Sequence, residues 1–169
     1  MEIAIIAHDG KKDEMVKFLK EYEDFFHQDH IQLIATGTTG NKVKSAGFKV
    51  QPYLSGPIGG DAQIAGRVAE EKCKMVIFFR DPLEKHPHEP DVLMLLRICD
   101  VHNVPLASNP ASAKLLINSF LYLLYQDQNF LLMMRHKIKY LKGSSHLKIY
   151  CFDLRNLKFY YKEILLNLI

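Results

Sequence analysis

The chain has 169 residues, of which 48% are hydrophobic and 24% are charged, and its formal net charge is +3. This length suits one domain with a buried core, and so small a charge does not indicate binding to nucleic acid or to a membrane. No segment is long and apolar enough to span a bilayer, no signal peptide follows Met1, and the three cysteines lack CxxC spacing. We therefore expect a cytoplasmic protein with reduced thiols, without a zinc or disulfide framework.

Short β-prone runs alternate with helix-like stretches up to residue 119. The expected strands cover 2–8, 31–36, 48–54, 75–79 and 104–108, and the expected helices cover 12–26, 40–46, 59–73 and 89–102. Strands that are apolar on both faces and alternate with helices indicate a parallel sheet covered on both sides. The sequence predicts an α/β fold of three layers, Rossmann-like, with a mostly parallel sheet and helices on both faces. Ligands of such sheets bind at the carboxyl ends of the strands.

The second expected strand leads into TGTTGN, residues 36–41. Its backbone N–H groups and three hydroxyls at a helix N-terminus suit a phosphate monoester, and glycine lets a ligand approach the backbone closely. An ordinary capped turn needs only one threonine and one glycine. The motif therefore favours a phosphate site.

The third expected strand leads into SGPIGGD, residues 55–61. Taken alone, Asp61 is most simply explained as the N-cap of a helix, a position that aspartate favours. Beside a phosphate pocket, however, a carboxylate on a glycine-rich loop becomes a candidate base.

The fourth expected strand is followed by DPLEKHPHEPD, residues 81–91, whose three prolines restrict the backbone. His88 and Asp91 could act in acid–base chemistry, or as metal ligands together with His86. The spacing does not favour a metal, because no second His/Cys set accompanies them. Asp91 could equally be a helix cap.

These motifs occur in an order and spacing that resemble the methylglyoxal synthase family. The resemblance covers about residues 1–118 and is carried by AHDGKK, ATGTTGN, LSGPIGGD, DPLEKHPHEPDVLMLLR and NVPLASNPASA. It implies a lyase that converts dihydroxyacetone phosphate to methylglyoxal and inorganic phosphate, without a metal or an organic cofactor. It also implies a homohexamer that phosphate, its product, can inhibit.

The resemblance assigns roles residue by residue. Asp61 matches the catalytic base, His8 and His88 match histidines near the substrate's oxygens, and Asp81 and Asp91 match supporting carboxylates. The residues that match the phosphate and substrate pocket are Lys12, Thr36, Thr38, Thr39, Gly40, Ser55 and Gly56, with Arg97 at a family-like position and His8 and His88 beside them.

The implied chemistry explains these residue types. We expect a carboxylate to remove a proton from the carbon bearing the phosphate ester, and imidazole to stabilise the enediolate oxygen. Elimination requires the C–O(phosphate) bond to stand perpendicular to the enediolate plane. The threonine–glycine loop would hold the leaving phosphate at that angle.

Residues 120–169 differ in composition from residues 1–119. They hold 8 Lys/Arg against 3 Asp/Glu and 10 of the 18 aromatic residues, and they contain no Ala, Val, Thr or Pro. We expect a catalytic domain in 1–119 and an atypical, poorly packed tail in 120–169. Either a coding frameshift has altered the C-terminus, or the tail is an added helical or membrane-surface segment.

Two other functions fit parts of the pattern. The same fold serves as the ligand-sensing domain of carbamoyl phosphate synthetase and in a purine-biosynthesis enzyme, so a regulatory module is one alternative. A metal-dependent hydrolase using His86, His88 and Asp91 is the other. Asp61 together with His8 and His88 favours the lyase, because a sensor needs a phosphate cradle but no base.

Overall fold

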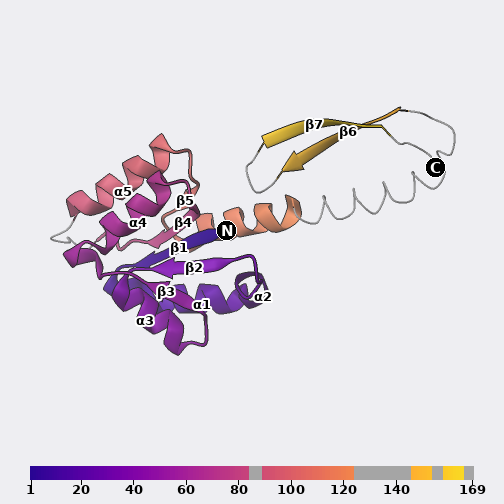
Figure 1. Cartoon of the computed structure of the whole chain (residues 1–169). Helices are drawn as coiled ribbons and strands as arrows, with labels where there is room; N and C mark the ends of the chain where they lie inside the picture. Colours follow the sequence, from indigo (N-terminus) through magenta and orange to yellow (C-terminus); the bar gives the residue numbers. More distant parts are fainter. Residues whose placement is uncertain (84–88, 124–145, 154–157, 166–169) are drawn as a thin grey trace. The chain divides into compact units, whose positions relative to one another are not determined.

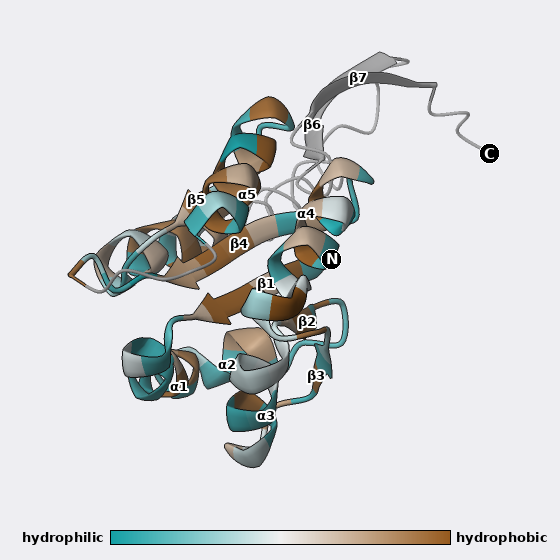
Figure 2. Ribbon diagram, turned by 90° about the vertical axis from the view of Figure 1, so that its left-hand side faces the viewer, coloured by the Kyte–Doolittle hydropathy of each residue, from teal (hydrophilic) through white to brown (hydrophobic). Residues whose placement is uncertain are grey.

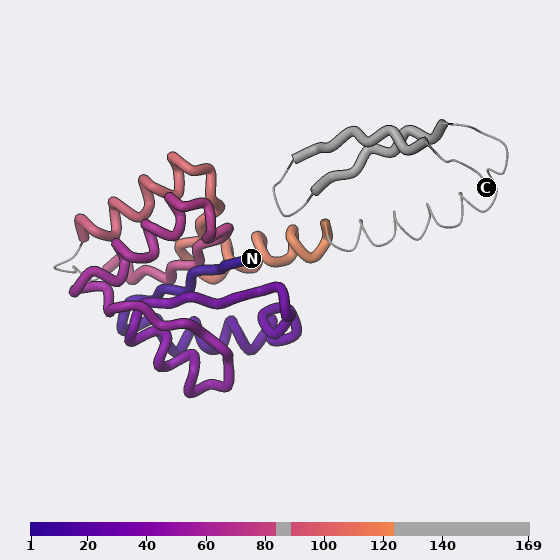
Figure 3. Tube along the Cα trace, viewed as in Figure 1, coloured from indigo at the N-terminus to yellow at the C-terminus, as the bar shows by residue number. Residues whose placement is uncertain are grey.

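The computed structural model describes residues 1–83, 89–123, 146–153 and 158–165. It divides into two compact units, Met1–Leu116 and Ile117–Ile169. Figure 1 colours the chain from indigo to yellow, and Figure 3 follows the same path as a tube.

The first unit is built on one five-stranded sheet in which every strand pair is parallel. Its spatial order is β3-β2-β1-β4-β5. The strands are β1 (Glu2–Ala7), β2 (Gln32–Ala35), β3 (Val50–Pro52), β4 (Cys73–Phe79) and β5 (Leu106–Ala107). The predicted parallel α/β fold is confirmed.

Helices cover both faces of this sheet, with α4 and α5 on one side and α1 and α3 on the other (Figure 1). The helices are α1 (Lys12–Glu21), α2 (Glu23–Phe26), α3 (Gly37–Ser45), α4 (Gly60–Ala69) and α5 (Glu89–Val101), with 3-10 turns η1 (Asp9–Lys11) and η2 (Gly56–Ile58) and a further helix over 110–123. The helix expected from residue 40 already begins at Gly37. The TGTTGN motif is therefore the first turn of α3 and not a loop before it.

The core lies on both faces of β1 and β4, where the hydrophobic colours concentrate in Figure 2. On the α4 and α5 face, Ile6 and Phe78 pack with Ile64 and Leu95. On the other face the ring of Phe18, from α1, lies 5.5 Å from that of Phe79. Burial of both faces is the reason that the central strands read as continuous apolar runs.

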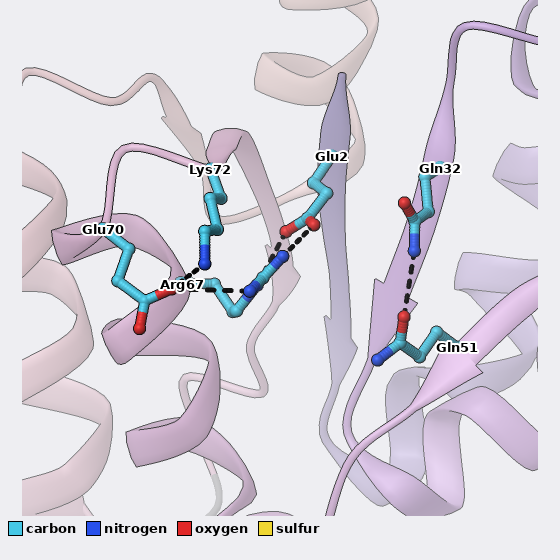
Figure 4. A network of polar contacts seen from close by, with 6 residues as sticks. All are labelled: Glu2, Gln32, Gln51, Arg67, Glu70 and Lys72. Carbon is cyan, nitrogen blue, oxygen red and sulfur yellow. Dashed lines mark hydrogen bonds and ion pairs between the residues drawn. The ribbon is translucent and has the colours of Figure 1, made fainter.

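A polar network lies at the amino-terminal ends of the strands (Figure 4). Arg67 of α4 donates from Nε to Glu2 Oε2 at 2.9 Å and from Nη2 to the other carboxylate oxygen, and this bond raises the pKa of Arg67. The Lys72 ammonium lowers the pKa of the Glu70 carboxyl. These charges are paired with one another at the edge opposite the glycine-rich and threonine-rich motifs.

The second unit contains an antiparallel pair of strands, β6 (His146–Asp153) and β7 (Lys158–Leu165). Its register places Tyr150 opposite Tyr161. This hairpin was not predicted from the sequence. The predicted poor packing of residues 120–169 also concerns residues 124–145, which lie outside the described residues. Within the described part, every helix is too short or too polar to span a bilayer.

Candidate active site

A cavity of about 220 Å³ opens at the carboxyl end of the sheet. It lies where the chain leaves β1 and β2 and where the segment after β3 approaches them. Its lining consists of Ile6, Ala7, His8, Asp9, Thr36, Thr38, Gly56, Pro57, Asp61 and Phe78. Three separate sequence motifs thus meet around one space, as expected for ligand binding in a parallel sheet.

Asp61 reaches this cavity from the first turn of α4. The N-cap of α4 is Gly59, with φ of 99°, and the helix begins at Gly60, so Asp61 is not the N-cap that it could have been from sequence alone. Its side chain is 1% exposed. A Cβ on Gly60 would lie 1.9 Å from the Leu54 carbonyl oxygen. Glycine at position 60 therefore lets α4 start close enough to the preceding segment to bring Asp61 to the cavity.

His8 is held in one orientation by main-chain groups. Its backbone N–H donates to Phe79 O at 3.1 Å, and its ring Nδ1 accepts the backbone N–H of Asp81 at 2.9 Å. The ring meets Phe78 edge-on, at 5.1 Å between centroids. Because Nδ1 accepts a hydrogen bond, the neutral tautomer that fits this arrangement carries its proton on Nε2.

Asp81 supports His8 through its backbone, while its carboxylate shapes the turn. Asp81 Oδ1 accepts the N–H of Leu83 at 3.1 Å. Asp81 does not itself line the cavity. Asp81 thus contacts His8 through its backbone N–H, and the role of a supporting carboxylate stays a prediction.

The three threonines of the TGTTGN motif point in different directions. Thr36 occupies the N-cap of α3 but makes no side-chain capping bond; its Oγ1 donates instead to Thr39 Oγ1 at 3.3 Å. Thr39 is buried and bonds to Ala7, whereas Thr38 is exposed and lines the cavity. Because the Gly37 N–H donates to Leu54 O, the first-turn N–H groups that Thr36 leaves uncapped for an anion are those of Thr38 and Thr39.

Gly37 ties the threonine motif to the glycine-rich segment. Its N–H donates to Leu54 O at 2.9 Å, and a Cβ at this position would lie 3.0 Å from Tyr53 O. Gly40 similarly faces Pro52, whose Cβ would be 3.2 Å from an added Cβ. The two small-residue motifs are therefore packed backbone to backbone.

Lys12 approaches the cavity through Asp9. Its ammonium group bonds to Asp9 Oδ1, and Asp9 lines the cavity. Asp9 is not among the residues predicted from the sequence, although it lies near the end of the first strand, between the candidate residues His8 and Lys12. The signal that could have identified Asp9 is a polar residue close to the end of an apolar strand. Pro57 and Phe78 also line the cavity without having been selected.

Other predicted residues do not line the cavity. Ser55 is the N-cap of η2, and its carbonyl accepts the N–H groups of Ile58 and Gly60 at 3.1 and 3.0 Å. Asp91 and Arg97 both belong to α5, with Asp91 in its first turn and Arg97 exposed. His86 and His88 fall outside the described residues.

A metal site was considered from the sequence and is not found in the described part of the chain. There, no group of three or more His, Cys, Asp or Glu residues is arranged to hold a metal ion. Cys73 and Cys99 are free and buried. Burial raises the pKa of the Cys73 thiol to about 11 and that of Cys99 to about 12.

Comparisons with known proteins agree on one family. A family model described as an MGS-like domain matches residues 14–108. The chain is 53% identical over 121 residues to the methylglyoxal synthase of Clostridium beijerinckii, an alignment covering 71% of this chain and 100% of the relative. It is 52% identical over 120 residues to that of Carboxydothermus hydrogenoformans, covering 70% and 98%.

A solved structure supports the same comparison. The crystal structure of methylglyoxal synthase from Elizabethkingia anophelis NUHP1 matches with a TM-score of 0.63 and 40% sequence identity, over 68% of this chain and 75% of that one. Because the Clostridium beijerinckii relative is aligned over its whole length, it has no counterpart to the rest of this chain.

Proposed function

The chain belongs to the methylglyoxal synthase family, and we propose that the cavity at the carboxyl end of its sheet is the active site for that family's reaction. The enzyme is a carbon–oxygen lyase that converts dihydroxyacetone phosphate to methylglyoxal and inorganic phosphate. One observation carries the site assignment. The buried carboxylate of Asp61 lines the same cavity as His8 and the first turn of α3.

Asp61 is the proposed base. An enediolate can expel phosphate only from a carbon next to its double bond, so the proton must leave the hydroxymethyl carbon of the substrate. The sequence-based expectation took the proton from the phosphate-bearing carbon, but its loss from there would leave the phosphate attached to the double bond. Removal from the hydroxymethyl carbon leaves the phosphate on the adjacent carbon, from which it can be expelled. A buried carboxylate held by a helix start can be aimed at one such C–H bond.

His8 is the proposed donor to the oxygen that becomes negative. With Nδ1 occupied by the Asp81 N–H, its neutral ring can donate only from Nε2. A neutral imidazole that polarises a carbonyl beside a carboxylate base is also the arrangement in triosephosphate isomerase, whose reaction passes through an enediolate as well. His88, the second histidine implied by the resemblance, stays a prediction.

The first turn of α3 is the proposed phosphate cradle. Its N–H groups, the Thr38 hydroxyl and the nearby Lys12 ammonium would hold the phosphate oxygens. When the enediolate forms, its electron pair expels the phosphate from the neighbouring carbon, and the resulting enol takes up a proton to become methylglyoxal. Because the cradle belongs to a helix packed on Leu54, it can hold the breaking C–O bond out of the enediolate plane.

The other residues of the expected pocket have proposed supporting roles. Gly40, Ser55 and Gly56 are proposed to let the walls come close to the phosphate, and Gly56 lines the cavity. Thr36 and Thr39 support this first turn through hydrogen bonds within the protein. Asp91 and Arg97 lie on α5 away from the lining, so any action that they have on the substrate would be indirect.

The assembly and location are part of the same proposal. The resemblance implies a homohexamer that is inhibited by phosphate and uses no metal or organic cofactor. The composition and charge favour a cytoplasmic protein without a nucleic-acid or membrane partner. Exposed apolar side chains support self-association, since Ile58 is 66% exposed and Leu83 is 96% exposed. Sedimentation with and without phosphate measures the subunit number directly.

Substrate turnover by wild-type protein and an Asp61→Asn variant tests the function. Wild-type protein should release methylglyoxal and inorganic phosphate in equal amounts from dihydroxyacetone phosphate. Asp61→Asn keeps the shape but removes the base, so kcat should fall by at least about 10²–10⁴-fold, while phosphate binding persists. Near-wild-type turnover by the variant contradicts the role of Asp61. Phosphate binding by a wild-type protein that turns nothing over would favour the ligand-sensing alternative.

A further inference from the structure

The Thr39 hydroxyl is fully occupied by contacts within the protein. Thr39 Oγ1 accepts the Ala7 N–H at 3.3 Å and donates to the Ala7 carbonyl at 3.2 Å. It also accepts the Thr36 hydroxyl at 3.3 Å. A hydroxyl has one donor and two acceptor positions, so all of its hydrogen-bonding positions are taken. The residue is 1% exposed.

Ala7 needs these bonds because β1 extends beyond its neighbour on one side. Ala7 pairs with Phe79 of β4, and the following N–H, that of His8, donates to Phe79 O. The N–H and C=O of Ala7 then point away from β4, as parallel ladders require. On that side β2 ends at Ala35, opposite Ile5. Buried backbone groups need partners, and Thr39 provides both in place of the missing strand.

We propose that Thr39 is a positioning residue, which joins the phosphate cradle to His8, and that its hydroxyl does not bind phosphate. Thr39 belongs to the first turn of α3, and Ala7 immediately precedes His8. The bonds between them set the distance from the cradle to the histidine. Loss of the hydroxyl should therefore disturb the chemical step more than phosphate binding. The proposal rests on the proposed function of this cavity.

The same contacts give the hydroxyls of the three threonines different roles. Thr36 also lines the cavity, but it is buried and its hydroxyl donates a hydrogen bond to Thr39 Oγ1, so that its proton is already engaged within the protein. Thr38 is exposed and lines the cavity, so its hydroxyl can reach a ligand that enters there. Thr38 is therefore the threonine whose hydroxyl donates to phosphate.

Isosteric variants separate the two roles. Thr39→Val removes the hydroxyl and keeps the shape, Thr39→Ser keeps the hydroxyl, and Thr38→Val removes the exposed hydroxyl. Thr39→Val should lower kcat about ten- to hundredfold and change the Kd for inorganic phosphate by less than about threefold. Thr39→Ser should restore most of kcat. Thr38→Val should instead raise that Kd about ten- to hundredfold.

Hydrogen exchange at the Ala7 amide gives a readout that does not depend on turnover. It should accelerate in Thr39→Val and return to the wild-type rate in Thr39→Ser. Phosphate binding weakened in Thr39→Val as much as in Thr38→Val, with unchanged Ala7 exchange, would overturn the proposal. Should Thr39→Val not fold, Thr39→Ala, which also removes the hydroxyl, decides: a phosphate Kd within about threefold of wild type supports the proposal, and a tenfold increase refutes it. If the wild-type protein does not turn over dihydroxyacetone phosphate, the proposed function is refuted. The phosphate Kd values and the Ala7 exchange rates still test the proposed role of Thr39.

Discussion

Gly60→Ala should damage both stability and activity, because position 60 has no room for a side chain. The added Cβ would lie 1.9 Å from the Leu54 carbonyl oxygen, 2.7 Å from its carbon and 2.9 Å from the Ser55 carbonyl carbon. Since such contacts do not occur below 3.0 Å, the start of α4 or the segment before it must move by about 1 Å. The Leu54 carbonyl also accepts the Gly37 N–H, so the disturbance reaches the phosphate cradle.

The magnitude follows from these distances. Overpacking of this kind costs about 1–3 kcal/mol of unfolding free energy. Asp61 is the residue after Gly60, and a catalytic group misplaced by about 1 Å can lose about a hundredfold in rate. We therefore expect a kcat on dihydroxyacetone phosphate roughly a hundredfold below wild type, together with a lower urea midpoint.

Gly66→Ala is the matched control within the same helix. Gly66 is exposed, and an added Cβ would meet nothing within 4 Å. Alanine at an open helical position stabilises by about 0.4–1 kcal/mol relative to glycine, so this variant should unfold at higher urea and keep its activity. Wild-type stability and turnover in Gly60→Ala would refute the argument that the close approach of Leu54 positions Asp61.

Three further predictions concern the core, the metal question and the second unit. Burial raises the pKa of the Cys73 thiol from 9.0 to about 11. The neutral thiol therefore stabilises the fold fully below pH 9, and this contribution, on the order of 2–3 kcal/mol, is lost as the pH rises toward 11. The free energy of unfolding, measured with urea from pH 8 to 11, should fall accordingly, and the fall should be smaller in Cys73→Ala. Turnover should survive exhaustive EDTA treatment, whereas loss on chelation with recovery on adding a divalent ion would support the hydrolase alternative. An isolated two-stranded sheet is marginal in water, so amides of β6 and β7 should exchange faster than those of 75–79; core-level protection would show that the C-terminal unit is well packed.

The sequence by itself determined the fold class and identified part of the candidate site. Continuous apolar runs such as 75–79, alternating with helical periodicity, are a local signal that only a parallel sheet buried on both faces satisfies. The same alternation placed the polar motifs at one edge. Asp61 and His8 could be selected because their residue types suit proton transfer and both follow expected strands.

Only the tertiary structure decided what each side chain of the site contacts. Thr39 meets Ala7 across 32 positions of sequence, and the Asp81 amide meets His8 across 73. Neither contact can be read from sequence periodicity. The Thr39–Ala7 contact depends on where β2 ends beside β1, and the Asp81–His8 contact depends on how the segment after β4 turns. Sequence alone therefore treated three threonines as equivalent. Packing assigns one hydroxyl to the cavity and directs the other two into the protein, since buried backbone groups at a strand end must find partners.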